Sequence, residues 1–123
     1  MDNDMKNAPF IEKSEALLPR RDKNTNKTDY GRILIAGGCV GYTGAPTMCA
    51  QAALRAGAGL VYLGVPSSIY DITAVKNDEA MPFPLPCDTD GRLTADALLP
   101  LRKYYDRCGV LALGPGLGRS RGT

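Results

Sequence analysis

The stretch that decides the fold runs from Gly31 to Pro46 and reads GRILIAGGCVGYTGAP. Its apolar residues 33–36 have the composition of a short buried strand, and the run then breaks into glycines. Glycine adopts positive φ and has no side chain, so the backbone can turn sharply there and approach a ligand closely. A helical pattern begins after Gly44, and a helix N-terminus offers unpaired N–H groups to an anion. This order is typical of a nucleotide or phosphate site, but alone it is not specific.

Strands and helices alternate along the rest of the chain. Three apolar runs predict parallel strands in one sheet, the last two of them buried, over residues 32–36, 60–65 and 109–113. Three helical patterns with capping or helix-ending residues lie between or beside these strands. Residues 45–56 follow the first strand, residues 69–76 follow the second, and residues 95–106 precede the third. Alternation of this kind predicts an α/β fold with a mainly parallel sheet.

The shorter segments are predicted from local chemistry. Residues 79–81 form a short strand candidate, and the proline-rich residues 82–91 a loop. Residues 11–18 could make a short helix, and residues 20–30 have little to bury and are predicted as an extended loop. Ser67 or Ser68 is expected to cap the second helix, and Thr94 the third. The apolar face of the third helix is expected to consist of Leu98, Leu99, Leu101 and Tyr105.

A second glycine loop, Gly114-Pro115-Gly116-Leu117-Gly118, follows the strand at 109–113. The carboxyl ends of parallel strands meet at one edge of a sheet, and ligands bind in the crevice outside that edge. We therefore expect both glycine loops to lie side by side and to form one ligand site.

Composition limits the function classes. The chain has 123 residues, which is enough for one domain. Its 44% apolar and 23% charged residues are typical of soluble globular proteins. The net charge of +2 and the absence of any large Lys/Arg cluster argue against nucleic acid. No apolar stretch approaches the roughly 20 residues of a membrane helix. The polar, acidic residues 1–4 do not resemble a secretory signal, so the expected location is the cytoplasm, away from membranes.

The cysteines and Lys27 are weaker candidates. Four widely spaced cysteines and no histidine argue against a zinc site or a Cys–His nucleophile, and we expect reduced, mostly half-buried thiols. Cys39 lies in the first glycine loop and could be near a ligand without taking part in chemistry. Lys27 could reach a phosphate, although most exposed lysines only solvate a surface.

Five segments occur in an order that resembles the ADP-dependent (S)-NAD(P)H-hydrate dehydratase family, whose fold is the ribokinase-like three-layer α/β sandwich. The resemblance covers about residues 15 to 118. The segments are Lys27–Gly31, Gly37–Pro46, Ala52–Val61, Glu79–Met81 and Gly114–Gly118.

This resemblance implies an enzyme that dehydrates the S-hydrate of NADH or NADPH and converts ADP to AMP and phosphate. ADP, or ATP, would be the co-substrate, with Mg²⁺, and the complete enzyme would be a homo-oligomer. The family's contacts to the hydrate match Ala45 and Gly116 here, where small residues let a flat ring approach closely. The other candidates for the substrate site are Gly38, Thr43, Gly44 and Gly114, with Lys27 as a weak phosphate candidate.

Departures from the family pattern also shape the expectation. Asn26 stands where the family often has His, and Asn77 and Asp78 precede Glu79 where Pro is usual. The family's Gly-Thr-Gly-Asp motif, with its catalytic Asp, is not among these 123 residues. The resemblance implies that this Asp lies beyond Thr123, so no catalytic residue is assigned within the chain.

The missing motif sets the expected extent of the domain. We expect residues 1–123 to be the N-terminal part of one ribokinase-like domain, with a leader and loop at 1–31 and βα units at 32–118. The second half of the domain would follow Thr123. Alone, residues 1–123 would be inactive.

Three alternatives remain open. A Rossmann-type dinucleotide-binding domain would need G-x-G-x-x-G and an acidic residue after the second strand, and this chain has neither. A small-molecule kinase of the ribokinase-like fold is disfavoured by residues 42–45 and 56–59. A non-catalytic fragment that binds a partner chain is the third. The carboxylates Asp71, Asp78 and Glu79 fall at predicted helix or strand ends, where solvated caps are the usual role.

Overall fold

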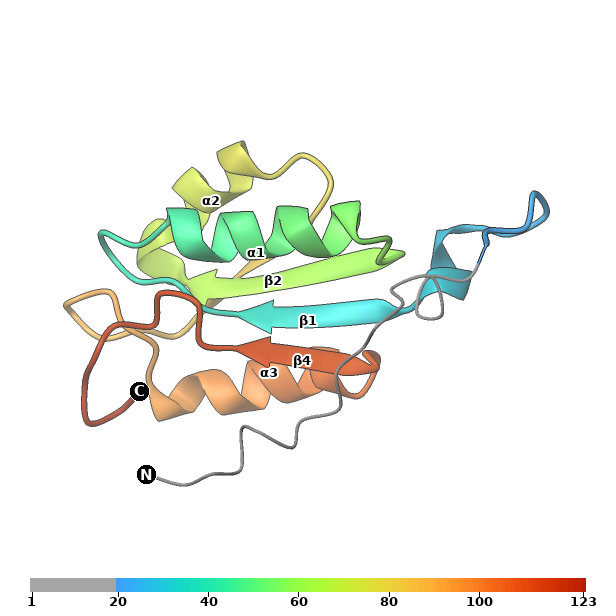
Figure 1. Cartoon of the computed structure of the whole chain (residues 1–123). Helices are drawn as coiled ribbons and strands as arrows, with labels where there is room; N and C mark the ends of the chain where they lie inside the picture. The colour runs from blue at the N-terminus through green and yellow to red at the C-terminus, as the bar shows by residue number, and fades with distance from the viewer. Residues whose placement is uncertain (1–19) are drawn as a thin grey trace, which may run out of the picture.

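The computed structural model describes residues 20–123, so the helix expected over residues 11–18 lies outside the described part. In this part the strands form one sheet of order β3-β2-β1-β4, with helices on both faces (Figure 1). The strands are β1 (Arg32–Ala36), β2 (Leu60–Pro66), β3 (Met81–Leu85) and β4 (Val110–Leu113). The helices are α1 (Gly44–Arg55), α2 (Tyr70–Lys76) and α3 (Leu98–Tyr105).

All three strand pairs are parallel, which confirms the predicted sheet. Ile33 of β1 is in register with Val61 of β2 on one side and with Val110 of β4 on the other. Parallel neighbours need a crossover connection, and the helical segments between the strands supply it. The α/β prediction from alternating patterns is thus confirmed.

Two apolar clusters hold the layers together. Successive strand residues point to opposite faces, so Ile35 packs under α1 with Ala50, while Leu34 faces the α3 side. In Figure 1, α1 and α2 lie above the sheet and α3 below it. Ala50 is fully buried, and its small side chain lets α1 approach the sheet closely.

β3 corrects the prediction for this part of the chain. The strand is Met81–Leu85 rather than 79–81, and it includes Pro82 and Pro84, which were expected in a loop. Proline lacks an N–H group and is tolerated on an edge strand, where that group would face away from the sheet. Among residues 20–123, β3 is such an edge, and it pairs only with β2.

The predicted burial of β4 and of the α3 face is also wrong. β4 is the other edge of the sheet, and its Val110 is 55% exposed. Leu98 of α3 is 68% exposed, and Leu99 and Tyr105 are exposed with it, whereas Leu101 packs against the core as predicted. Tyr104 turns inward instead and stacks on Phe83, with ring centroids 3.9 Å apart. The ring contact sets the rotation of α3.

The turns before α2 and α3 differ from the expected caps. Short 3₁₀ turns at Ser67–Ile69 and Ala95–Ala97 precede these helices, and neither Ser67, Ser68 nor Thr94 makes a side-chain cap bond. Residues 27–30 also form a 3₁₀ turn rather than extended chain. The Asn26 side chain accepts a hydrogen bond from the Thr28 amide at 2.8 Å, which stabilises that turn locally.

Within residues 20–123, no helix has both the length and the apolar composition needed to cross a membrane.

Candidate functional site

The two glycine loops touch each other at the carboxyl edge of the sheet. The Gly38 amide donates a hydrogen bond to the Pro115 carbonyl oxygen at 2.8 Å. Gly37 is so close to this carbonyl that a Cβ atom built on it would lie 2.5 Å from the oxygen. The prediction that the loops lie side by side is confirmed, because β1 and β4 are adjacent and parallel and both loops leave their carboxyl ends.

Ala45 and Gly116 are brought together by this contact. A Cβ atom on Gly116 would lie 3.2 Å from the Ala45 Cβ and 3.1 Å from the Tyr42 Cβ. Gly116 also has φ of +72°, a conformation that other residues rarely adopt. Glycine is therefore required here twice, for the backbone turn and for the close packing of the loops.

A cavity of about 930 Å³ opens beside this contact. Three segments form its wall: the first glycine loop, the connection between β3 and α3, and the second glycine loop. The lining residues are Cys39, Val40, Tyr42, Thr89, Asp90, Arg92, Gly116, Gly118 and Arg119. Its size suits a small-molecule ligand, for which pockets of roughly 300–1,000 Å³ are usual.

The charged groups of the cavity were not predicted. Arg92 Nη2 lies 3.1 Å from the Asp90 carboxylate, and Arg92 Nη1 donates to the Arg119 carbonyl oxygen at 3.2 Å. Asp88 organises this turn, because its carboxylate accepts from the amides of Asp90 and Arg92 at 3.0 and 2.8 Å. The sequence signalled a turn at residues 88–91, but nothing local indicated that the turn would fold against the glycine loops.

The predicted site residues fall into two groups. Gly116 lines the cavity, while Gly38, Thr43, Gly44, Ala45 and Gly114 belong to the same two loops without lining it. Lys27 is not brought to them. It precedes β1, and its backbone packs against Gly59 just before β2, at the opposite end of the sheet.

Thr123, beyond which the family's catalytic Asp is expected, is not among the residues that line the cavity. Its hydroxyl donates to the carbonyl oxygen of Leu93 at 3.3 Å, so the segment after the second glycine loop folds back onto the connection between β3 and α3. Residues 119–123 contain no acidic side chain. The position of the catalytic Asp beyond Thr123 therefore stays a prediction, and no catalytic residue is assigned within residues 20–123.

The cysteine thiols are unpaired in the described part of the chain. Cys39 is buried in the cavity wall, where a Cβ atom on Gly118 would lie 3.2 Å from its sulfur, so its predicted place beside the site holds. A hydrogen bond with the Ser67 hydroxyl, at 3.3 Å, lowers the pKa of the Cys87 thiol. Burial raises the pKa of Cys108.

Residues 20–123 do not form a three-ligand protein site for the Mg²⁺ that the resemblance implies. Nowhere in residues 20–123 do three His, Cys, Asp or Glu side chains come together as a possible metal site. We therefore derive no chemical step through a metal from these residues.

Comparison with known proteins gives one family. Residues 33–123 match the Carb_kinase family, described as NAD(P)H-hydrate dehydratase. The chain is 48% identical over 106 residues to a bifunctional NAD(P)H-hydrate repair enzyme Nnr of Moorella thermoacetica, covering 86% of this chain and 20% of the relative. It is 36% identical to an ADP-dependent (S)-NAD(P)H-hydrate dehydratase of Streptococcus pneumoniae, covering 85% and 32%. An ATP-dependent dehydratase of Aedes aegypti is 33% identical, with 93% and 32% covered.

Solved structures support the same fold. A ribokinase-like superfamily protein of Enterococcus faecalis superimposes with a TM-score of 0.68 at 24% identity, covering 84% of this chain and 33% of that chain. A Streptococcus mutans protein gives 0.64 at 29% identity, covering 83% and 33%. Strand order 3-2-1-4 also occurs in Rossmann folds, so topology alone does not separate the two. The family match and these neighbours favour the ribokinase-like fold. The chain spans between a fifth and a third of the relatives' length.

Proposed function

This chain belongs to the NAD(P)H-hydrate dehydratase family, and we propose that it binds the S-hydrate of NADH or NADPH between its two glycine loops. The observation that carries this proposal is the Gly38–Pro115 hydrogen bond at 2.8 Å, which holds the loops together. It puts Ala45 beside Gly116, the two positions matched to hydrate contacts. Gly38, Thr43, Gly44 and Gly114 complete the proposed half-site.

The cavity beside these loops can supply charge as well as space. Arg92 and Arg119 line it, and a guanidinium group suits the phosphates of a dinucleotide. Asp90, which also lines the cavity, pairs with the Arg92 guanidinium at 3.1 Å. Gly116 lines the cavity beside the loop contact, so a flat ring in the cavity could lie against its backbone, where no side chain intervenes.

For the reaction, we propose dehydration of the hydrate to NADH or NADPH, coupled to conversion of ADP to AMP and phosphate. Relatives are named as ADP- or ATP-dependent, which supports a nucleotide co-substrate. None of residues 20–123 is assigned as the catalytic base, and the role proposed for this chain is substrate binding. We also propose a homo-oligomer as the active form. A cytoplasmic location is proposed because the four cysteines are unpaired in the described part.

A titration of ¹⁵N-labelled protein with the S-hydrate of NADPH tests the proposal. We expect amide shifts in residues 38–45 and 114–118, and none around Gly31 and Gly59 at the opposite end of the sheet. NADPH itself and ADP serve as control ligands, and each should cause smaller shifts. If the hydrate shifts no amide in either loop, or shifts only those near Gly59, the proposed site is wrong.

A further inference from the structure

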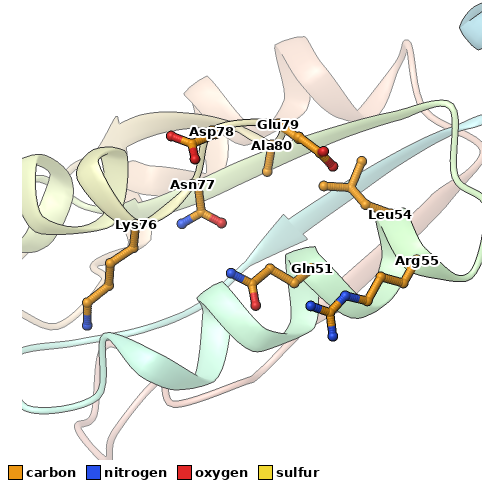
Figure 2. Close-up of a pocket in the computed structure, with 8 residues that line it drawn as sticks. All are labelled: Gln51, Leu54, Arg55, Lys76, Asn77, Asp78, Glu79 and Ala80. Atoms are coloured by element: carbon orange, nitrogen blue, oxygen red, sulfur yellow. The ribbon is translucent and has the colours of Figure 1, made fainter.

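The end of α2 reaches across to the first turn of α1 and holds it by side-chain hydrogen bonds. Lys76 Nζ donates to the Thr43 hydroxyl oxygen at 2.9 Å. Asn77 Nδ2 donates to the Thr47 hydroxyl oxygen at 3.3 Å, and that hydroxyl donates to the Thr43 carbonyl oxygen at 2.9 Å. Thr43 is therefore held from α2 at two atoms. Figure 2 shows Lys76 and Asn77 leaving the end of α2, with both side chains directed toward α1.

Most of this network is buried. Thr47, Thr73 and Asn77 are the buried polar side chains of residues 20–123, and all three belong to it. Asn77 is 8% exposed, and its Nδ2 also donates to the Thr73 carbonyl oxygen at 2.8 Å. The bond from Lys76 to Thr43 is exposed, whereas the bonds from Asn77 lie in the low-dielectric interior, where hydrogen bonds hold their geometry tightly and restrict where the first turn of α1 can lie.

The orientation of Asn77 is set by its donors. Its carboxamide oxygen is buried without a hydrogen-bond partner, beside a cleft of about 300 Å³ between α1 and the turn before β3. Leaving a buried acceptor unpaired is costly, and the bonds from Nδ2 to Thr73 and Thr47 offset that cost. The orientation of the Asn77 carboxamide is therefore set by these two hydrogen bonds and not by its unpaired oxygen beside the cleft.

The network acts at a point where α1 lacks its usual local support. Thr43 is the residue before α1, but its side chain makes no cap bond to the helix and accepts from Lys76 instead. Capping would have placed this turn from within its own segment. Here the placement comes from residues 30 or more positions along the chain.

We propose that Lys76 and Asn77 are positioning residues for the hydrate half-site. They fix Thr43, and through it Ala45, against Gly116 of the second glycine loop. This inference rests on the proposed function, because it concerns the same site. Neither residue is placed in contact with the hydrate, so each acts on binding through the first turn of α1.

The test compares Lys76→Met with Lys103→Met. Both changes remove one exposed lysine charge and keep an unbranched stem, but Lys103 lies on α3, on the other face of the sheet. Lys76→Met should weaken hydrate binding about 2- to 10-fold, the range expected for loss of one hydrogen bond. It should also shift the amide resonances of Gly44 and Ala45 in the free protein. Lys103→Met should do neither.

Two further variants sharpen the result. Lys76→Arg keeps a donor and should restore both affinity and amide positions. Thr43→Val removes the acceptor, so adding Lys76→Met to it should cause no further loss of affinity beyond that of Thr43→Val alone. Asn77→Leu removes both donors at similar volume and should move Thr47 as well, and its melting curve shows whether it folds.

Wild-type affinity and unshifted amides in Lys76→Met would overturn the proposal, as would an equal loss in Lys103→Met. Amide shifts in Lys76→Met, with no hydrate binding by the wild-type protein, would overturn the proposed function and still support positioning of Thr43 by Lys76. The two failures are therefore distinguishable.

Discussion

Gly37→Ala should separate the two glycine loops and destabilise the protein. Gly37 is buried directly after β1, and a methyl group there would lie 2.5 Å from the Pro115 carbonyl oxygen and 2.9 Å from Pro115 Cγ. The first neighbour is backbone, so it cannot rotate away. The second loop must move outward, and the hydrogen bond from the Gly38 amide to that same oxygen must lengthen or break.

The expected loss follows from two terms. A net intramolecular hydrogen bond is worth about 0.5–1.5 kcal/mol. Forcing an extra carbon into a packed interior costs about 1–3 kcal/mol. Together they predict a fall in the free energy of unfolding of about 1.5–4.5 kcal/mol. Hydrate binding should fall as well, because Ala45 and Gly116 would no longer meet.

Urea unfolding of Gly37→Ala and Gly109→Ala measures this directly. Gly109 precedes β4, and a methyl group there would meet nothing within 4 Å. Its φ is not positive, so Gly109→Ala should be neutral or slightly stabilising. The reasoning is refuted if both variants unfold within about 0.5 kcal/mol of each other, since that difference is within the usual range of surface changes.

Three more predictions concern other parts of the molecule. Cys87, whose pKa is lowered by the hydrogen bond with Ser67, should be alkylated at lower pH than Cys108, whose pKa is raised by burial. Mass spectrometry across a pH series measures this, and Ser67→Ala should move the alkylation of Cys87 to higher pH. In a form of the enzyme that also binds ADP, Gly116→Val should weaken hydrate binding far more than ADP binding, because Val would be strained at φ of +72° and would press on Ala45. Equal losses of the two affinities in separate titrations would limit Gly116 to a role in the turn. The exposed apolar edge at β4 should cause concentration-dependent self-association, which Leu113→Lys reduces and Val75→Lys on α2 does not; a monomer at every concentration in sedimentation velocity would contradict this.

The strands of the inner sheet and the edge at which the two glycine loops lie were predictable from the sequence. Residues 33–36 and 60–65 are nearly continuous apolar runs, and such runs need cover on both faces whatever their neighbours are. The glycine loops begin where the strands at 32–36 and 109–113 end. Once those strands are parallel, both loops must lie at one edge of the sheet, but the contact between Gly38 and Pro115 also depends on β1 and β4 being direct neighbours.

Features decided by position in the fold were not predictable. Local sequence patterns disfavour a strand at Pro82 and Pro84. An edge strand tolerates them because the N–H group that proline lacks would face away from the sheet and make no hydrogen bond within it. The α3 helix has apolar residues on several sides, and the side that faces the sheet is the one with Leu101 and Tyr104, whose ring stacks on Phe83.

The same limit applies to the site. Local patterns located both glycine loops, because turn and strand chemistry depends on adjacent residues. Asp90 and Arg92 reach the cavity, and Lys76 reaches Thr43, only after separate connections have closed onto one edge of the sheet. Contacts between residues some 30 positions apart depend on how the intervening helices pack, and no local pattern encodes that. The sequence by itself therefore determined where the loops lie, and the tertiary structure decided which charged side chains meet them.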